Sequence, residues 1–180
     1  DAALRMSSGI FYASHNWQPF FIEGTKTLAY ELWESFGFSA PDNVITPLGY
    51  GSNVLGLERG FDELLRNGEI SRLPRIFGVQ AENCAPCHAA WVAGGNAPVS
   101  VTVLPTIAEG IAASQPTRLV EVLRAIRRSQ GGIAAVSEDA IVAALRALAR
   151  MGLYVEPTSA AAAAGLTQFG VNIVRMAPGA

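Results

Sequence analysis

The chain has 180 residues, of which 50% are hydrophobic, with a formal net charge of −2 and a mean hydropathy of +0.27. This length most economically forms one domain with a sizeable core. No apolar run approaches the ~18–20 residues that a membrane span needs. The basic residues are also scattered, so we expect neither a membrane segment nor a nucleic-acid partner.

The start of the chain and its cysteine content indicate the cellular compartment in which we expect the protein. Residues 1–11 have no basic leader, no apolar core and no initiating Met. We therefore expect no signal peptide, and a chain that starts partway through a longer protein. The two cysteines cannot form a disulfide framework, so a reducing cytoplasm is the expected location.

The hydrophobic pattern alternates between helical and strand-like segments. Apolar residues at helical spacing predict helices over residues 24–37, 52–68, 116–129, 137–152 and from 158 onward. Short apolar runs predict strands over residues 43–48, 74–81, 132–136 and 153–157, with residues 171–180 as a last strand cut short. Such alternation indicates right-handed β-α-β units. We expect one three-layer α/β domain over residues 1–180, with helices on both faces of a mostly parallel sheet.

Capping residues and glycines mark the ends of several predicted helices. Thr25 or Thr27 is the expected N-cap of the first helix, which should end at Gly37. Ser137, followed by two acidic residues, is the expected N-cap of the helix that ends at Gly152.

Both cysteines lie in a C-x-x-C-H pattern of Cys84, Cys87 and His88, by which c-type haem is attached to a chain. Covalent haem would also need a distal ligand, for which Met151 and Met176 are the available residues. The pattern closely follows a predicted strand, as in a redox pair, whereas a zinc site lacks a nearby fourth ligand. The strand–helix alternation around it favours buried structural cysteines over a haem, redox or metal module.

A turn rich in glycine carries a stronger signal. We call it the glycine loop; it lies between a predicted strand and a predicted helix and consists of Gly49, Tyr50, Gly51, Ser52 and Asn53. Backbone N–H groups and the helix dipole favour an anion at such a turn, and its Ser and Asn side chains can cap the helix or donate to oxygens. It is not a Walker A loop, and Val54 replaces the third glycine of the dinucleotide fingerprint. It is either an ordinary turn or a site for a phosphate-bearing ligand of another kind.

Five stretches resemble, in the same order, the threonine synthases and threonine-synthase-like members of the fold-type-II pyridoxal-phosphate (PLP) enzymes. They are residues 14–34, 41–56, 74–86, 106–112 and 154–166. The resemblance implies a PLP-dependent lyase of amino-acid metabolism, acting by elimination or replacement at the β- or γ-carbon of an amino acid. A threonine/serine dehydratase-like ammonia-lyase is the alternative within this class. A haem module and a non-catalytic nucleotide-phosphate domain are the alternatives outside it.

The resemblance also implies roles for residues. It assigns the cofactor phosphate to the glycine loop and the lining of the cofactor ring to residues 106–110. It places Asn16 near the substrate, with capping of the next helix as the alternative role. Many threonine synthases have an arginine for the substrate phosphate where this chain has Phe21, and an apolar ring cannot pair a phosphate dianion. This departure argues against O-phosphohomoserine as the substrate.

The family pattern is incomplete in this chain. The Schiff-base lysine of the family precedes every stretch found here, and the late Thr-Gly-x-Gly stretch is missing. Lys26, the only lysine, lies in a segment that the family carries in addition, so we expect it to face solvent and expect no catalytic residue here. His15 and His88 show no base or metal partner and are expected to be structural. We therefore expect an incomplete cofactor-binding domain with weak PLP affinity and no turnover. Because family members are often dimers, the resemblance also implies a homodimer.

Overall fold

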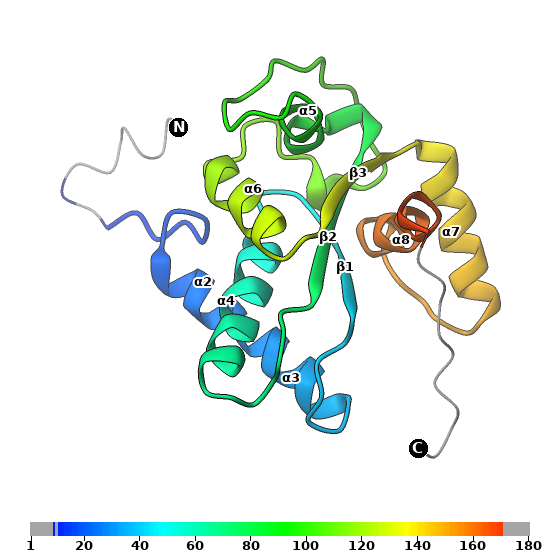
Figure 1. Cartoon of the computed structure of the whole chain (residues 1–180). Helices are drawn as coiled ribbons and strands as arrows, with labels where there is room; N and C mark the ends of the chain where they lie inside the picture. The colour runs from blue at the N-terminus through cyan, green and yellow to red at the C-terminus, as the bar shows by residue number, and fades with distance from the viewer. Residues whose placement is uncertain (1–8, 10, 171–180) are drawn as a thin grey trace.

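The computed structural model describes residue 9 and residues 11–170 (Figure 1). Their centre is a three-stranded parallel sheet in the order β1-β2-β3, formed by β1 (Asn43–Pro47), β2 (Arg75–Ala81) and β3 (Gly132–Val136). All strands of a parallel sheet end at the same edge, so the three segments that follow them gather there.

Helices cover both faces of the sheet, as Figure 1 shows, and the predicted three-layer α/β fold is confirmed. On one face lie α2 (Pro19–Thr25), α3 (Thr27–Ser35), α4 (Ser52–Arg66), α5 (Pro86–Val92) and α6 (Leu119–Arg128). On the other lie α7 (Glu138–Arg150) and α8 (Pro157–Ala164). Three short 3-10 helices, η1 (Glu82–Cys84), η2 (Glu109–Ile111) and η3 (Gly165–Phe169), connect these elements.

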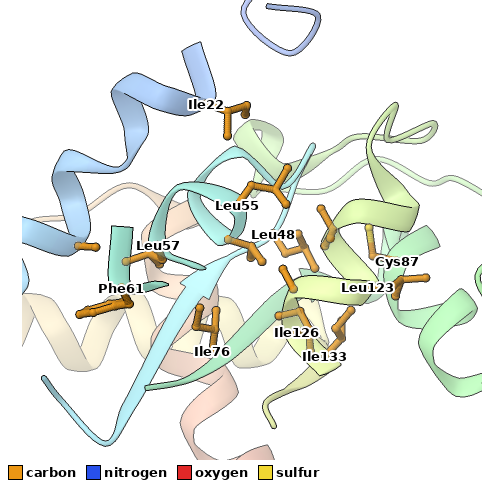
Figure 2. Close-up of a cluster of buried hydrophobic side chains, with 14 of the residues drawn as sticks. Ile22, Leu48, Leu55, Leu57, Phe61, Ile76, Cys87, Leu123, Ile126 and Ile133 are labelled. Atoms are coloured by element: carbon orange, nitrogen blue, oxygen red, sulfur yellow. The ribbon is translucent and has the colours of Figure 1, made fainter. Parts of the chain in front are cut away.

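Two hydrophobic cores result, one on each face. The larger, drawn in Figure 2, packs α4 and α6 against the sheet around Leu57, Phe61, Leu123 and Ile126, all fully buried. The smaller packs α7 and α8 against Val79 and its neighbours. Because β2 is covered on both faces, it is a nearly continuous apolar run, as is typical of parallel sheets.

The termini of several helices agree with the sequence analysis. Gly37, Gly68 and Gly152 all take positive φ angles of 66°, 78° and 80° directly after the helices that they were expected to end. The Ser137 side chain accepts a hydrogen bond from the Ala140 N–H at 3.2 Å and caps α7 as expected.

Two predicted elements are wrong. The predicted helix over residues 24–37 is two helices, because Pro19 begins α2 earlier and the chain turns at Lys26; Lys26, and neither threonine, is the N-cap of α3. The predicted strand over residues 153–157 is also absent: residues 153–156 connect α7 to α8, and Pro157 already belongs to α8. Tyr154 is 92% exposed there, whereas Val155 packs on the smaller core. The strand expected over residues 171–180 lies outside the described residues.

Helix α4 is approached very closely by the turn between α2 and α3. A β-carbon added to Gly56 would lie 2.4 Å from Thr25 Oγ1, and one added to Gly60 would lie 2.6 Å from Ala29 Cβ and 2.7 Å from the Lys26 carbonyl. Glycine therefore sets the distance between these helices. Within the described residues, no helix is long and apolar enough to cross a membrane.

The close approach predicts an unusual response to Gly60→Ala. In an open helix this change stabilises by ~1 kcal/mol. Here the methyl group meets backbone and a neighbouring Cβ, so we expect destabilisation by ~1–3 kcal/mol in urea unfolding. The matched control is Gly24→Ala in α2, where an added Cβ meets nothing within 4 Å and a small gain is expected. Equal effects of the two substitutions would contradict the packing described here.

Candidate functional site

A pocket of about 280 Å³ opens where β1 ends. It is lined by His15, Asn16, Pro47, the glycine loop, Gly110, Ile111, Glu156, Thr158 and Ser159. The fold thus brings Asn16 and all five residues of the glycine loop together, from segments far apart in the sequence. Gly110, from the stretch expected to line the cofactor ring, joins them.

Backbone geometry requires the two glycines of the loop. Gly51 has a φ of 93°, and a Cβ there would lie 2.2 Å from Val122 Cγ2 of α6. A Cβ on Gly49 would lie 3.1 Å from Ile111 Cα and 3.2 Å from the Gly110 carbonyl oxygen. Side chains at these positions would collide with α6 and η2, so glycine is required for the loop to pack against these two elements.

Two helices begin at this pocket. The N-cap of α4 is Gly51 and that of α8 is Glu156, and neither helix has a side-chain cap. The Ser52 and Asn53 side chains therefore do not cap α4 as expected. First-turn N–H groups have no acceptor within their helix, and the helix dipole places partial positive charge there. The pocket is accordingly suited to an anion such as a phosphate group.

A buried glutamine holds the loop in place. Gln80, at 0% exposure, donates from Nε2 to the Leu48 carbonyl at 3.1 Å and accepts from the His88 backbone N–H at 2.9 Å. The residue before the glycine loop is thereby tied to α5 through a β2 side chain. Sequence analysis missed Gln80, since a polar residue at the end of a predicted strand gives no signal of its partners.

Asn16 is buried at 6% exposure and does not cap a helix, since the N-cap of α2 is Gln18. Its Nδ2 donates to His15 Nε2 at 2.9 Å, and its backbone carbonyl accepts from Arg118 Nε at 3.0 Å. Its Oδ1 has no hydrogen-bond partner among the described residues. The alternative role of Asn16 as a local cap is therefore wrong.

Six lining residues were not predicted as site residues: the apolar Pro47 and Ile111, and four polar residues. His15 was expected to be structural, yet it lines the pocket and its ring packs edge-on against Phe21, with ring centroids 5.0 Å apart. Glu156, Thr158 and Ser159 enter from the start of α8. The sequence gives no signal for these three residues, because no strand directly precedes α8 and only the fold brings its start to the pocket.

The C-x-x-C-H pattern is part of the core. Cys84 and Cys87 are both 0% exposed and unpaired, and burial raises the pKa of the Cys87 thiol to about 12. Burial also lowers the pKa of His88. No group of three or more His, Cys, Asp or Glu in the described part of the chain could hold a metal ion. The haem alternative is thus unsupported, and the thiols pack as small apolar side chains.

Lys26 differs from the expected solvent-facing lysine. Its side chain is 16% exposed, and Nζ lies 2.6 Å from both Glu23 Oε2 and Glu63 Oε1. The hydrogen bonds that Lys26 donates to these two carboxylates raise its pKa above the ordinary value. The amine is thereby held protonated, and Lys26 is not among the residues that line the pocket.

A parallel α/β sheet with an open glycine loop and a helix N-terminus at its carboxyl edge defines a class of domains that bind phosphate-bearing ligands. A match to a known protein family narrows this class further. Residues 1–174 match the family described as "Pyridoxal-phosphate dependent enzyme", and the chain belongs to that family. The suspected resemblance is confirmed at this level.

Curated relatives are threonine synthases. The chain is 35% identical over 156 residues to that of Methanosarcina acetivorans, covering 86% of this chain and 38% of the relative. It is 35% identical over 158 residues to the threonine synthase of Methanocaldococcus jannaschii, covering 87% of this chain and 39% of that relative. The chain therefore spans about two fifths of the length of these relatives.

Solved structures with the same fold carry other activities in their names. A threonine deaminase of T.th. superposes with a TM-score of 0.67 at 27% identity, over 85% of this chain and 54% of that one. An L-serine ammonia-lyase of Rhizomucor miehei superposes with a TM-score of 0.70 at 22% identity, over 84% of this chain and 45% of that one. At this identity the likeness shows the fold alone.

Burial of the two thiols predicts their reactivity. Ellman's reagent should leave both Cys84 and Cys87 unmodified in the folded chain up to pH 9, because neither is accessible and both thiol pKa values are raised. After unfolding in urea, two thiols should react. Rapid labelling of either cysteine in the folded chain would contradict the structural role assigned to the pattern.

Proposed function

We propose that the chain is the cofactor-phosphate-binding part of a PLP-dependent lyase that acts on an amino acid and resembles threonine synthase. One observation carries this proposal: the glycine loop and two helix N-termini meet in a single pocket. The family supplies the identity of the phosphate-bearing ligand. Gly49 and Gly51 support the proposal because they let the loop pack against Ile111 and Val122, which holds its backbone beside the pocket.

The residues of the chain then have definite tasks. The N–H groups of Ser52 and Asn53 bind phosphate oxygens, and Gly49 and Gly51 let the backbone approach them. Gln80 keeps the loop at the end of β1 through the Leu48 carbonyl. When bound, PLP supplies an electron sink for chemistry at the amino-acid carbon atoms. The polar residues opposite the loop orient the amino acid.

The proposal includes an incomplete domain. Lys26 is protonated and lies away from the pocket, and no other lysine occurs in the sequence. We propose that the lysine that carries the cofactor, and the stretch facing the pyridine nitrogen, belong to parts of the protein outside this chain. A cytoplasmic location and a homodimer are proposed on the resemblance alone.

An ammonia-lyase is the second candidate. Phe21 stands where an arginine would meet a substrate phosphate, and its ring packs against His15 at the pocket. The likeness to a threonine deaminase at 27% identity agrees with this activity. Both candidates use the same cofactor site.

Substitution of Gly51 tests the phosphate site. Gly51→Ala places a methyl group against Val122, so we expect PLP affinity to fall by ~10-fold or more as phosphate hydrogen bonds are lost. The matched control is Gly68→Ala, which replaces another glycine of positive φ but lies at the opposite end of α4. Binding is read from the ³¹P NMR shift of millimolar PLP, with ADP as competitor. Equal effects of the two variants, or preference for ADP, would contradict the proposal.

The isolated chain should bind PLP weakly and not turn over substrate. Treatment with PLP and borohydride should leave Lys26 unmodified, because its amine stays protonated between two carboxylates. Mass spectrometry of the wild type and of Lys26→Arg should show the same adducts. A stable adduct on Lys26 together with release of a keto acid from threonine would show that this chain is a complete catalyst.

A further inference from the structure

A second pocket, of about 670 Å³, lies between the loop that follows α5 and the loop that precedes α6. We call it the valine pocket; it is lined by Pro86, Pro98, Val99, Ser100, Val101, Val103, Ser114, Gln115, Pro116, Thr117 and Leu119. Among the described residues, it shares no lining residue with the pocket of the glycine loop. Its volume lies in the range of ~300–1,000 Å³ that is typical of small-molecule sites.

Hydrogen bonds hold the first of these loops at both ends. Arg127 Nη2 donates to the Gly95 carbonyl at 2.7 Å, and the Leu104 N–H donates to the Asn83 carbonyl at 2.8 Å. Asn83 Nδ2 also donates to the Pro105 carbonyl at 2.6 Å. This wall of the valine pocket is therefore formed without a ligand, as is usual for small-molecule sites.

The valine pocket reaches down to the first turns of two core helices. Pro86 is the first residue of α5 and Leu119 the first residue of α6, and both are buried. The second loop ends at Arg118, whose Nε donates to the Asn16 carbonyl at 3.0 Å. The pocket thus has a fixed apolar base, where the apolar surface of a ligand can be removed from water.

The lining of the valine pocket carries no charged side chain. Residues 93–108 and 112–117, which contain the two loops, include no Asp, Glu, Lys or Arg. Arg118, which follows the second loop, donates from Nη1 to the Glu121 carboxylate at 3.1 Å. The polar groups that the lining offers belong to serine, threonine and glutamine side chains, all of them uncharged.

The helix N-termini at the valine pocket offer less to an anion than those at the glycine loop. The first residue of α5 is a proline without an N–H, and the His88 N–H donates to Gln80 Oε1 at 2.9 Å. In α6 the Leu119 N–H donates to the Pro116 carbonyl at 3.2 Å, and Glu121 lies in the first turn. A carboxylate there offsets the positive end of the helix dipole.

We infer that the valine pocket is a second ligand site, which binds an uncharged small molecule with an apolar body and an amide or hydroxyl group. The valines and prolines contact the apolar body, and Ser100, Ser114, Gln115 and Thr117 bind the polar group. A charged molecule is disfavoured, because it would lose water without gaining a counter-ion. The inference goes beyond the proposed function and does not depend on it, since the cofactor phosphate is assigned to the other pocket.

Three probes of one shape test the site. Benzamide is neutral, benzoate is an anion and benzamidinium is a cation at neutral pH. Each is titrated into the chain, and dissociation constants, expected in the millimolar range for such small molecules, are read from ¹H–¹⁵N NMR shifts. We expect benzamide to bind ~10-fold or more tightly than either charged probe, with the largest shifts at residues of the valine pocket.

Variants assign the binding to this lining. Val101→Trp fills the pocket and should abolish the saturable binding of benzamide. Val99→Lys introduces a cation, so the preference should change from benzamide to benzoate. The matched control is Val92→Lys, at a 70% exposed valine of α5 outside the pocket, which should leave the order of the three probes unchanged. Circular dichroism confirms that each variant is folded.

Several results would overturn the inference. Benzamide would show no saturation at tens of millimolar, the charged probes would bind as tightly, or the shifts would fall on the glycine loop. Unchanged binding of all three probes to Val99→Lys would overturn it as well. Sedimentation velocity shows whether a second copy of the chain covers the pocket, which would exclude the ligand and overturn the inference too. PLP binding at the glycine loop is measured separately, so these results are distinguishable from failure of the proposed function.

Discussion

The arrangement of the helices depends on how closely the neighbouring elements can pack against helix α4. Besides the sheet, α4 meets the loop from β1, helix α6 and the α2–α3 segment. At each contact a glycine removes the Cβ that would hold them apart, namely Gly51 against Val122 and Gly56 and Gly60 against the α2–α3 turn. With these contacts made, the first turn of α4 lies at the carboxyl edge of the sheet. Packing thereby fixes where the N-terminus of the helix lies.

The pocket at that edge combines donors and acceptors. The N-termini of α4 and α8 begin at it, and Asn16 and Glu156 also line it. The chain belongs to a family of pyridoxal-phosphate dependent enzymes. Phe21, which stands where many threonine synthases have an arginine, packs on the ring of His15 beside this pocket.

The C-x-x-C-H pattern shows why a short match needs its surroundings. The pattern is complete as a string, yet both thiols lie in the core under α5. His88 contributes its backbone N–H, which donates to Gln80 and so supports the glycine loop indirectly. The segment thus has a connection to the site, although through backbone geometry and not through thiol or imidazole chemistry.

The sequence alone determined the strand–helix alternation, the ends of helices at Gly37, Gly68 and Gly152, and the glycine loop, because these depend on local preferences and spacing. It could not distinguish a strand from a connection at residues 153–157, where Leu153 and Tyr154 are exposed and Pro157 begins α8. It also could not show that Lys26 lies between two carboxylates, or that His15 and Glu156 share a pocket with Gly51. These arrangements join residues tens of positions apart, and only the tertiary packing of the helices on the sheet brings such residues together.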